Sequence, residues 1–394
     1  MGFLKQCIER RESGEDLVAL CAQRIADRDA ELRAWVEVSP QAPLGRGPLD
    51  GIPFAAKDIF ETRGLSTEFG SAIYAGRKGQ ADSALVSDFR RRGAILMGKT
   101  QTTAFASFDP APTRNPHNRA HTPGGSSSGS AAAVAAGTIP FALGSQTQGS
   151  ILRPASYCGV AGFKPTYGLL SLEGVMPFAP SLDTAGLFTQ TADDMRLLWN
   201  RMGLLTEAPR TTVAAAPQSL DVEPEMEAAF RRTIDRLKAV GFRIRMIDFP
   251  SRWPDLTAAS RLVNQYEGAR THEAVWRQHG ARLGARLAQL IADGLQLAES
   301  QYRDALALIG EMKQEMDVLF REYPVILTPA APGPAPRLES TGDPRMNAPW
   351  TALGTPAISI PMSHSGPLPL GLQLTARAGD DSRLLDFAVS ASLE

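Results

Sequence analysis

Serine, threonine and glycine residues gather in one uncharged part of the chain. No Asp, Glu, Lys or Arg occurs from Thr122 to Leu152, although 21% of the chain is charged. The segment holds two Gly/Ser-rich turns, residues 124–130 and 144–150, separated by an alanine run. Such turns offer hydroxyl groups and backbone N–H groups. These groups suit a serine nucleophile and the stabilisation of an oxyanion.

Two other chemistries fit the turns less well. Each turn matches the G-x-x-x-x-G part of a phosphate loop, but the Lys-Ser/Thr pair that completes the motif is missing from both. A serine with a histidine base would need His117 or His121. Neither Ser126 nor Ser150 lies in the G-x-S-x-G elbow of such enzymes. We therefore interpret the two histidines as part of a polar loop.

Lysine is the remaining candidate base, because burial disfavours its charged form and lowers its pKa. Lys57 follows the apolar run Ile52–Ala56, which predicts a buried strand ending at this lysine. The alternative from the residues alone is a lysine at a strand end with its ammonium group in water, which is the commoner arrangement.

Composition narrows the class of protein. The 394 residues, 43% of them hydrophobic, are enough for a large core, and a net charge of −1 gives no basis for binding nucleic acid or an anionic membrane. Three cysteines and five histidines show no metal-ligand spacing, so we expect no metal and no cofactor. Without a signal peptide or transmembrane run, we expect a cytoplasmic protein.

Periodicity predicts alternating helices and short buried strands, which is typical of an α/β fold. Helices are expected over residues 3–34, 82–92, 130–137, 192–204, 222–240, 255–320 and 382–392. Strands are expected over residues 52–56, 94–98, 139–143, 325–328, 357–360 and 370–374. The charged, helical middle of the chain, about 195–320, is interpreted as an insertion or cap on one domain spanning 1–394.

Several blocks in a fixed order resemble the amidase signature family of Ser-cisSer-Lys hydrolases, especially its small malonamidase-like members. The blocks are residues 51–58 (GIPFAAKD), 98–103 (GKTQTT), 115–134 (NPHN to AAAV), 144–155 (GSQTQGSILRPA), 159–168 (GVAGFKPTYG), 181–186 (SLDTAG), 354–361 (GTPAISIP) and 369–373 (PLGLQ). The resemblance implies a single compact α/β domain, in which helices cover both faces of a central mixed, twisted β-sheet.

The resemblance also implies roles for individual residues. Ser150 would be the nucleophile, and Lys57 the base that acts through Ser126, which would follow a cis peptide bond from Gly125. Backbone N–H groups would form the oxyanion hole, contributed by Thr147, Gln148, Gly149 and Ser150. The uncharged stretch agrees with this scheme, because a nearby carboxylate would hold the lysine in its ammonium form.

The sequence departs from the family pattern at four places. Ser128 stands where Gly is common, Gln146 where Asp is common and Gln148 where a small residue is frequent. Ala104-Phe105 stands where an acidic residue often precedes the aromatic one. We expect the side chain of Gln148 either to leave the oxyanion turn or to line the pocket.

Three residues are expected to contact substrate: Arg153, Gln101 and Gly125. The guanidinium of Arg153 could hold a substrate carboxylate through two parallel hydrogen bonds. The alternative is an internal salt bridge, for example to Asp183, that organises the loop.

The function predicted is hydrolysis of a small carboxamide to a carboxylate and ammonia or an amine through a Ser150 acyl-enzyme. Two alternatives remain: an amidotransferase subunit that works in a multi-subunit complex, and a catalytically inactive binding protein derived from the family. The short chain, with no added domain evident, favours a free-standing amidase. We expect a small-molecule amide as substrate, no nucleic-acid or membrane partner, and a homodimer.

Overall fold

A computed structural model describes residues 1–363 and 366–392 of the chain. The described part contains one sheet of eleven strands in the order β1-β3-β2-β4-β6-β5-β10-β11-β9-β7-β8. The strands are β1 (Trp35–Gln41), β2 (Pro53–Lys57), β3 (Ile95–Thr100), β4 (Phe141–Gln146), β5 (Ala161–Lys164), β6 (Thr184–Thr189), β7 (Val213–Pro217), β8 (Arg243–Ile247), β9 (Val325–Pro329), β10 (Ala357–Met362) and β11 (Leu370–Ala376).

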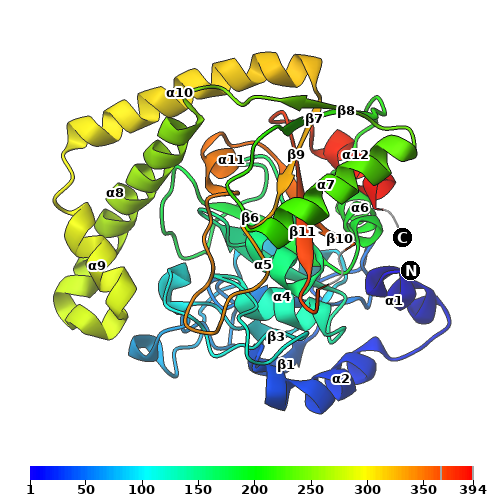
Figure 1. The fold of residues 1–394 in the computed structure, drawn as a ribbon. Helices are drawn as coiled ribbons and strands as arrows, with labels where there is room; N and C mark the ends of the chain where they lie inside the picture. The colour runs from blue at the N-terminus through cyan, green and yellow to red at the C-terminus, as the bar shows by residue number, and fades with distance from the viewer. Residues whose placement is uncertain (364–365, 393–394) are drawn as a thin grey trace.

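Helices surround this sheet (Figure 1). They are α1 (Phe3–Glu12), α2 (Leu17–Leu32), α3 (Ala84–Arg91), α4 (Ser128–Ala135), α5 (Leu152–Cys158), α6 (Ala192–Arg201), α7 (Pro224–Ala239), α8 (Trp253–His279), α9 (Ala285–Gly294), α10 (Glu299–Glu322), α11 (Ala348–Ala352) and α12 (Asp381–Ala391). The predicted class is confirmed: a single α/β domain with a large mixed sheet between helices.

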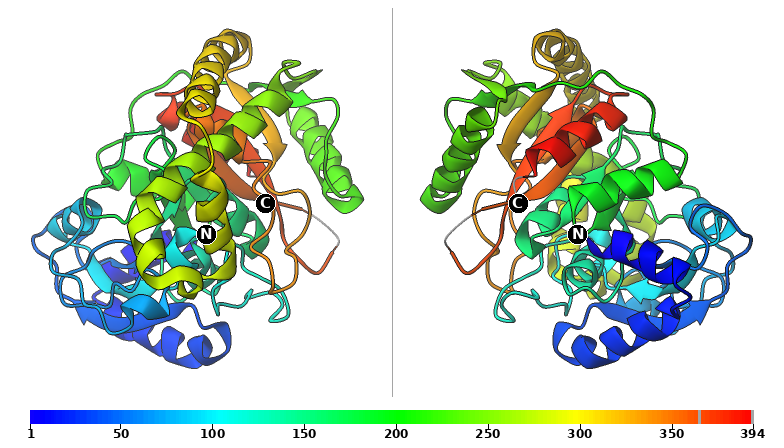
Figure 2. Two further views of the ribbon diagram at one scale, coloured as in Figure 1. Left: turned by 90° about the vertical axis from the view of Figure 1, so that its left-hand side faces the viewer. Right: turned by 90° about the vertical axis from the view of Figure 1, so that its right-hand side faces the viewer.

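Neighbouring residues of β5 show that helices cover both faces of the sheet. A Cβ added to Gly162 would lie 2.5 Å from the Ala155 Cβ of α5. The next side chain, Phe163, points to the opposite face, where its ring meets Trp199 of α6 with centroids 5.1 Å apart. Helix α4 packs beside α5, and α12 packs against α6 (Figures 1 and 2).

Three adjacent strands bring the predicted catalytic segments together. Strand β2 lies between β3 and β4 and pairs in parallel with both. All five residues of β2 and all six of β4 are buried, as expected for strands covered on both faces. Since the carboxyl ends of parallel strands meet at one edge, Lys57 lies beside the loop that follows Gln146.

The middle of the chain, residues 195–320, contains two strands that the sequence analysis missed. Strands β7 and β8 pair in parallel with each other and extend the central sheet beyond β9. β7 reads Val-Ala-Ala-Ala-Pro and β8 carries two arginines. β7 therefore has few strand-favouring residues, and β8 has no continuous apolar run. Helices α8, α9 and α10 project together on one side (Figure 1). Their interpretation as an insertion or cap stays a prediction.

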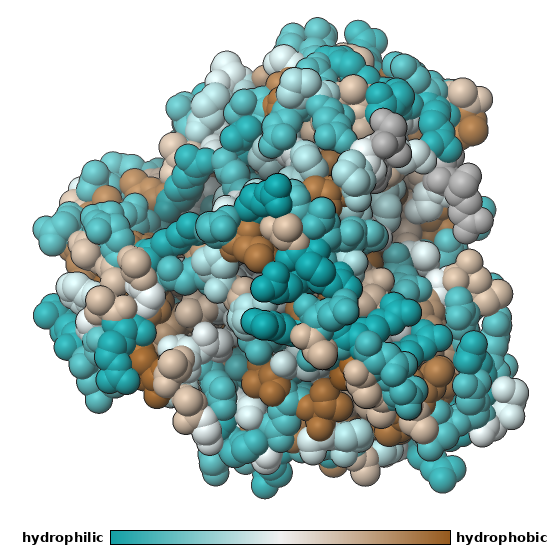
Figure 3. Space-filling view, turned by 60° about the horizontal axis from the view of Figure 1, so that its bottom comes forward, coloured by the Kyte–Doolittle hydropathy of each residue, from teal (hydrophilic) through white to brown (hydrophobic). Residues whose placement is uncertain are grey.

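The next two observations concern the hydropathy of the surface and of the helices. Hydrophobic side chains on the face drawn in Figure 3 form small separate groups within a mainly hydrophilic surface. Among the helices of residues 1–363 and 366–392, none combines the length and apolar character that crossing a bilayer requires.

A buried ion pair fixes the ends of β2 and β3. Lys99 Nζ lies 3.5 Å from the Asp58 carboxylate, and both side chains are at most 1% exposed. Lys99 also donates to the carbonyls of Phe60 and Ser66 and to the Thr67 hydroxyl. Burial raises the pKa of Asp58 to about 6. The carboxylate directly after Lys57 is therefore neutralised by Lys99.

We predict that Lys99→Met destabilises the protein by about 3–5 kcal/mol at pH 8, because it leaves the Asp58 charge buried and unpaired. The pKa of Asp58 would rise further above about 6. At pH 5 the carboxyl is then protonated in the folded variant, and the loss shrinks. Urea unfolding at both pH values measures the effect.

The control is Lys78→Met, which removes the exposed pair with Glu37 and should cost less than about 1 kcal/mol of stability. Equal losses for Lys99→Met at pH 5 and pH 8 would contradict the assignment.

Candidate active site

Lys57 is a buried lysine whose hydrogen-bond partners are serine hydroxyls. Its Nζ lies 2.7 Å from Ser126 Oγ and 2.8 Å from Ser145 Oγ. The side chain is 0% exposed. Burial lowers the pKa of Lys57 from its ordinary value of 10.5 to about 7. The alternative of a lysine head group in water is therefore wrong, because the strand end that carries it is enclosed by the sheet and its loops.

Two other buried lysines have different surroundings. Lys99 faces the Asp58 carboxylate, and Lys164 donates to the Pro165 carbonyl, with the charge of Asp381 nearby. Neither contacts a hydroxyl of the two Gly/Ser-rich turns among the described residues. Lys57 differs because two serines of these turns receive its hydrogen bonds. This is the geometry that a lysine base needs.

One carboxylate does approach Lys57, from outside the uncharged stretch. Asp183 directly precedes β6, and its charge opposes the lowering of the Lys57 pKa. Burial raises the pKa of Asp183 itself to about 6. The carboxylate accepts hydrogen bonds from the Thr147 hydroxyl and from the backbone of Phe178 and Ala179. These hydrogen bonds partly offset the negative charge of the carboxylate, which limits how far it raises the pKa of Lys57.

The first Gly/Ser-rich turn holds Ser126 in place. The peptide bond between Gly125 and Ser126 is cis. Ser128, the residue found where Gly was expected, donates its hydroxyl to the Gly124 carbonyl at 2.7 Å. A Cβ on Gly125 would lie 2.9 Å from Thr103 and 3.0 Å from Thr341, so a larger residue would crowd the turn.

The second turn presents backbone N–H groups in a row. Gln146 accepts hydrogen bonds from the N–H groups of Ile151 and Leu152 and so fixes the start of α5. The N–H groups of residues 147–150 make no hydrogen bond within the described part of the chain. A Cβ on Gly149 would lie 2.5 Å from Asn347 Oδ1. The turn therefore requires glycine and leaves four donors open for a ligand.

Gln148 both leaves this turn and lines the pocket. Its Nε2 lies 3.1 Å from the hydroxyl and 3.3 Å from the carbonyl of Ser260, on α8. Its Oε1 is buried and has no partner among the described residues. The large side chain thus connects the nucleophile loop to the helical middle of the chain.

Arg153 does not form the salt bridge to Asp183 that we considered. Its Nη2 donates to the Gly125 carbonyl at 2.6 Å, and its Nε and Nη1 are buried without partners in the described structure. That alternative is wrong, because Asp183 accepts its hydrogen bonds from the Thr147 hydroxyl and from the backbone instead. A 2% exposed guanidinium with open donors is suited to an anionic or carbonyl ligand.

The predicted substrate contacts divide into two groups. Arg153 and Gly125 meet beside the nucleophile loop through the hydrogen bond between them. Gln101 lies elsewhere: its amide lies 3.5 Å from the Trp35 carbonyl, and its backbone joins the residues before β1 to the start of α4. We therefore find no geometric support for Gln101 as a substrate ligand.

Two small cavities lie beside the turn that carries the predicted nucleophile, Ser150. The first, about 10 Å³, is lined by Ala106, Ser107, Phe108, Thr147, Gln148, Ser150, Arg153, Phe178 and Asn264. The second, about 170 Å³, shares Ala106, Thr147 and Phe178 with it and continues to Ser145, Asp183 and an apolar wall that includes Leu172, Val175 and Met176. The site therefore has a polar part at Ser150 with room for about one water molecule, and a larger, more apolar part beside it.

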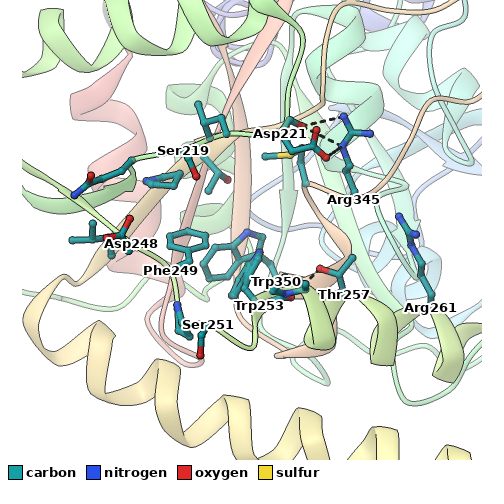
Figure 4. Close-up of a pocket in the computed structure, with 18 residues that line it drawn as sticks. Ser219, Asp221, Asp248, Phe249, Ser251, Trp253, Thr257, Arg261, Arg345 and Trp350 are labelled. Carbon is teal, nitrogen blue, oxygen red and sulfur yellow. Dashed lines mark hydrogen bonds and ion pairs between the residues drawn. The ribbon is translucent and has the colours of Figure 1, made fainter.

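A larger cavity of about 600 Å³ lies on another side of α8 (Figure 4). Trp253 and Trp350 form its centre, with ring centroids 4.7 Å apart. Arg261 and Arg345 lie to one side of them in Figure 4. None of the described residues that line it is a predicted catalytic residue.

Sequence reasoning missed three residues of the site. Ser145 precedes the nucleophile by five positions, and its hydroxyl within the uncharged stretch was the available signal. Ser260 and Asn264 belong to α8, far away in the chain. No motif marks them, because only the packing of α8 brings Ser260 to Gln148 and Asn264 to the cavity of Ser150.

Comparisons with known proteins identify the family of the chain. The amidase family model matches residues 6–385. A glutamyl-tRNA(Gln) amidotransferase subunit of Legionella pneumophila (strain Paris) is 31% identical over 444 aligned positions, covering 98% of this chain and 91% of the relative.

Two solved structures share the whole fold. The crystal structure of an amidase superposes with a TM-score of 0.90 at 27% identity and covers 100% of both chains. The corresponding glutamyl-tRNA(Gln) amidotransferase subunit of Thermotoga maritima gives a TM-score of 0.84 at 28% identity, covering 98% of this chain and 93% of that one. With the family model matching nearly its whole length, this chain belongs to the amidase signature family.

Proposed function

We propose that the protein hydrolyses a small carboxamide through an acyl-enzyme on Ser150, with Lys57 as the base and Ser126 as the proton relay. The contact that carries this proposal is the 2.7 Å distance between Lys57 Nζ and Ser126 Oγ. It joins a lysine with a pKa of about 7 to the turn that lies beside the nucleophile loop. A lysine with that pKa is partly neutral at physiological pH and can accept a proton.

In the first step, the neutral amine of Lys57 accepts the proton of Ser126, which takes the proton of Ser150. Ser150 Oγ then forms a bond to the amide carbon, and the carbonyl oxygen becomes an oxyanion. The four N–H groups of residues 147–150, which have no partner in the described part of the chain, would stabilise that charge. Losing one such donor typically costs about 2.7–4 kcal/mol of transition-state stabilisation.

In the second step, the C–N bond breaks and the proton returns through Ser126 to the leaving nitrogen, which departs as ammonia or an amine. Water then attacks the acyl-enzyme by the same relay and releases a carboxylate. Ser145, the second hydroxyl at Lys57 Nζ (2.8 Å), orients the amine but does not lie on this proton path.

The substrate we propose carries a carboxylate near the amide. Arg153 supports this because its Nε and Nη1 are buried with no partner in the described structure, and it lines the cavity of Ser150. A buried guanidinium gains most from an anion that accepts two parallel hydrogen bonds. The small volume of the adjoining cavity, about 170 Å³, favours a short substrate.

Two alternatives remain, and each has a discriminating measurement. The role of an amidotransferase component is supported by the 31% identity to the Legionella pneumophila protein. Such a component needs its partners, so simple amide hydrolysis by the purified single chain would argue against it. An inactive binding protein would bind amides equally well with and without Ser150 and release no ammonia.

The catalytic assignment predicts that Ser150→Ala and Lys57→Ala each lower kcat by at least about 10³-fold, because each removes a member of a unit that acts together. Ammonia release from a panel of small amides measures this loss. Hydroxylamine added to the wild-type enzyme should yield the hydroxamate by trapping the acyl-enzyme. Full activity in either variant would refute the mechanism.

The pH dependence follows from the lysine. The base must be neutral, so kcat/KM should rise with pH and level off above a midpoint near the Lys57 pKa of about 7. Asp183 raises that pKa, so Asp183→Asn should move the midpoint to lower pH. A pH profile of both enzymes from pH 5 to 9 measures the shift. A flat profile, or a shift to higher pH, would contradict the assignment.

The carboxylate hypothesis predicts a selective effect of Arg153→Ala. It should raise KM for malonamate on the order of 10–100-fold, because the charged hydrogen bonds to the carboxylate are lost. KM for propionamide, which carries a methyl group in place of the carboxylate, should change much less. Arg153→Lys keeps the charge without the fork of donors and serves as the conservative variant. Equal losses on the two amides would exclude a carboxylate at this position.

A further inference from the structure

Helix α8 presents a polar face to the catalytic loops. Ser260, Asn264 and Glu267 are spaced four and three residues apart, which places them on one side of the helix. All three are buried, with exposures of 0%, 6% and 8%. Polar side chains that are buried this deeply normally have hydrogen-bond partners, so each can be assigned a role from its contacts.

Two of the three have partners within the protein. The Ser260 hydroxyl interacts with Gln148 Nε2 at 3.1 Å and with the Ala348 carbonyl at 3.2 Å. Glu267 accepts from the Ser181 backbone at 2.9 Å and from the Tyr302 hydroxyl at 2.6 Å. These contacts hold the helix against the nucleophile loop and against the loop that precedes Asp183.

Asn264 lies between them and makes no hydrogen bond to the described residues, although only 6% of it is exposed. It lines the small cavity of Ser150 and Arg153. Asn264 and Ser150 line the same cavity, so the amide of Asn264 is free to bond a molecule that enters it. The open position of this amide therefore points to a ligand.

Arg153 lines the same cavity, and its Nε and Nη1 are buried with no partner in residues 1–363 and 366–392. The carboxylate that most influences it at a distance, Asp343, is already paired with Arg345 at 3.0 Å. A guanidinium and an amide NH₂ therefore face one space from two different elements, α5 and α8. Together they offer donors to both oxygens of one carboxylate.

We propose that Asn264 is a specificity-determining residue that donates its Nδ2 hydrogen to the substrate carboxylate held by Arg153. The substrate class is a short amide acid, in which the carboxylate lies one or two carbons from the amide that Ser150 attacks. This inference rests on the proposed amidase function. It assigns the choice of substrate to the helical middle of the chain, while the strand ends carry the chemistry.

The test compares malonamate with propionamide. Malonamate carries a carboxylate where propionamide carries a methyl group. For wild-type enzyme we expect kcat/KM to favour malonamate. Asn264→Ala should lower the ratio of kcat/KM for malonamate over propionamide on the order of tenfold, mainly through KM. Asn264→Asp, which has nearly the same shape, should lower it further, because a second carboxylate repels the substrate and competes for Arg153.

Arg261→Ala is the matched control. Arg261 lies on the same helix but lines the larger cavity (Figure 4), and its side chain is 60% exposed. If the substrate preference came from positive charge in general, this variant would lower the ratio as much as Asn264→Ala. We expect the ratio to stay within about twofold of wild type, since exposed charges interact weakly.

Several outcomes would overturn the proposal. If the ratio is unchanged in both Asn264 variants while Arg153→Ala shows its expected loss, Asn264 does not bind the carboxylate, although Arg153 does. Wild-type enzyme that prefers propionamide, or hydrolyses neither amide, would overturn the substrate class. Full activity of Ser150→Ala would instead refute the amidase mechanism itself, so the two failures are distinguishable.

Discussion

The site depends on a buried amine that has no carboxylate at hydrogen-bonding distance among the described residues. Moving an ammonium group away from water is costly, and this cost keeps the pKa of Lys57 near 7. The fold maintains the condition in two ways. Lys99 neutralises Asp58, the acid next to Lys57 in the chain, and the backbone around Asp183 supplies the donors that share its charge. Serine hydroxyls then become the partners of the lysine.

The proposed catalytic residues and the proposed specificity residue come from different parts of the molecule. Strands β2 and β4 run in parallel, so Lys57 and the nucleophile loop leave the sheet at one edge. The oxyanion turn needs the small Gly149 because Asn347 lies directly against it. Helix α8 closes the site from the other side through the contact between Ser260 and Gln148.

The sequence predicted much of the fold, and the errors have physical reasons. Strands with an uninterrupted apolar run, such as β2, β9 and β10, were identified, and so were most of the helices. Strands β1, β5, β6, β7 and β8 were not predicted. For β7 and β8 the reason is that an alanine-rich strand and an arginine-bearing edge strand carry little local signal. The salt bridge considered between Arg153 and Asp183 was wrong, since nothing in the sequence indicates that Asp183 bonds to Thr147 and the backbone.

By itself, the sequence determined the family, the mixed α/β class and the candidate triad of Lys57, Ser126 and Ser150. These properties depend on glycines, hydroxyls and apolar runs that are contiguous in the chain, so local pattern identifies them. The tertiary structure alone decided which charges surround the lysine, where the Gln148 side chain goes and which helix face meets Arg153. Those properties depend on contacts between residues far apart in the chain, for example Gln148 and Ser260, which only the packing of the sheet and α8 brings together.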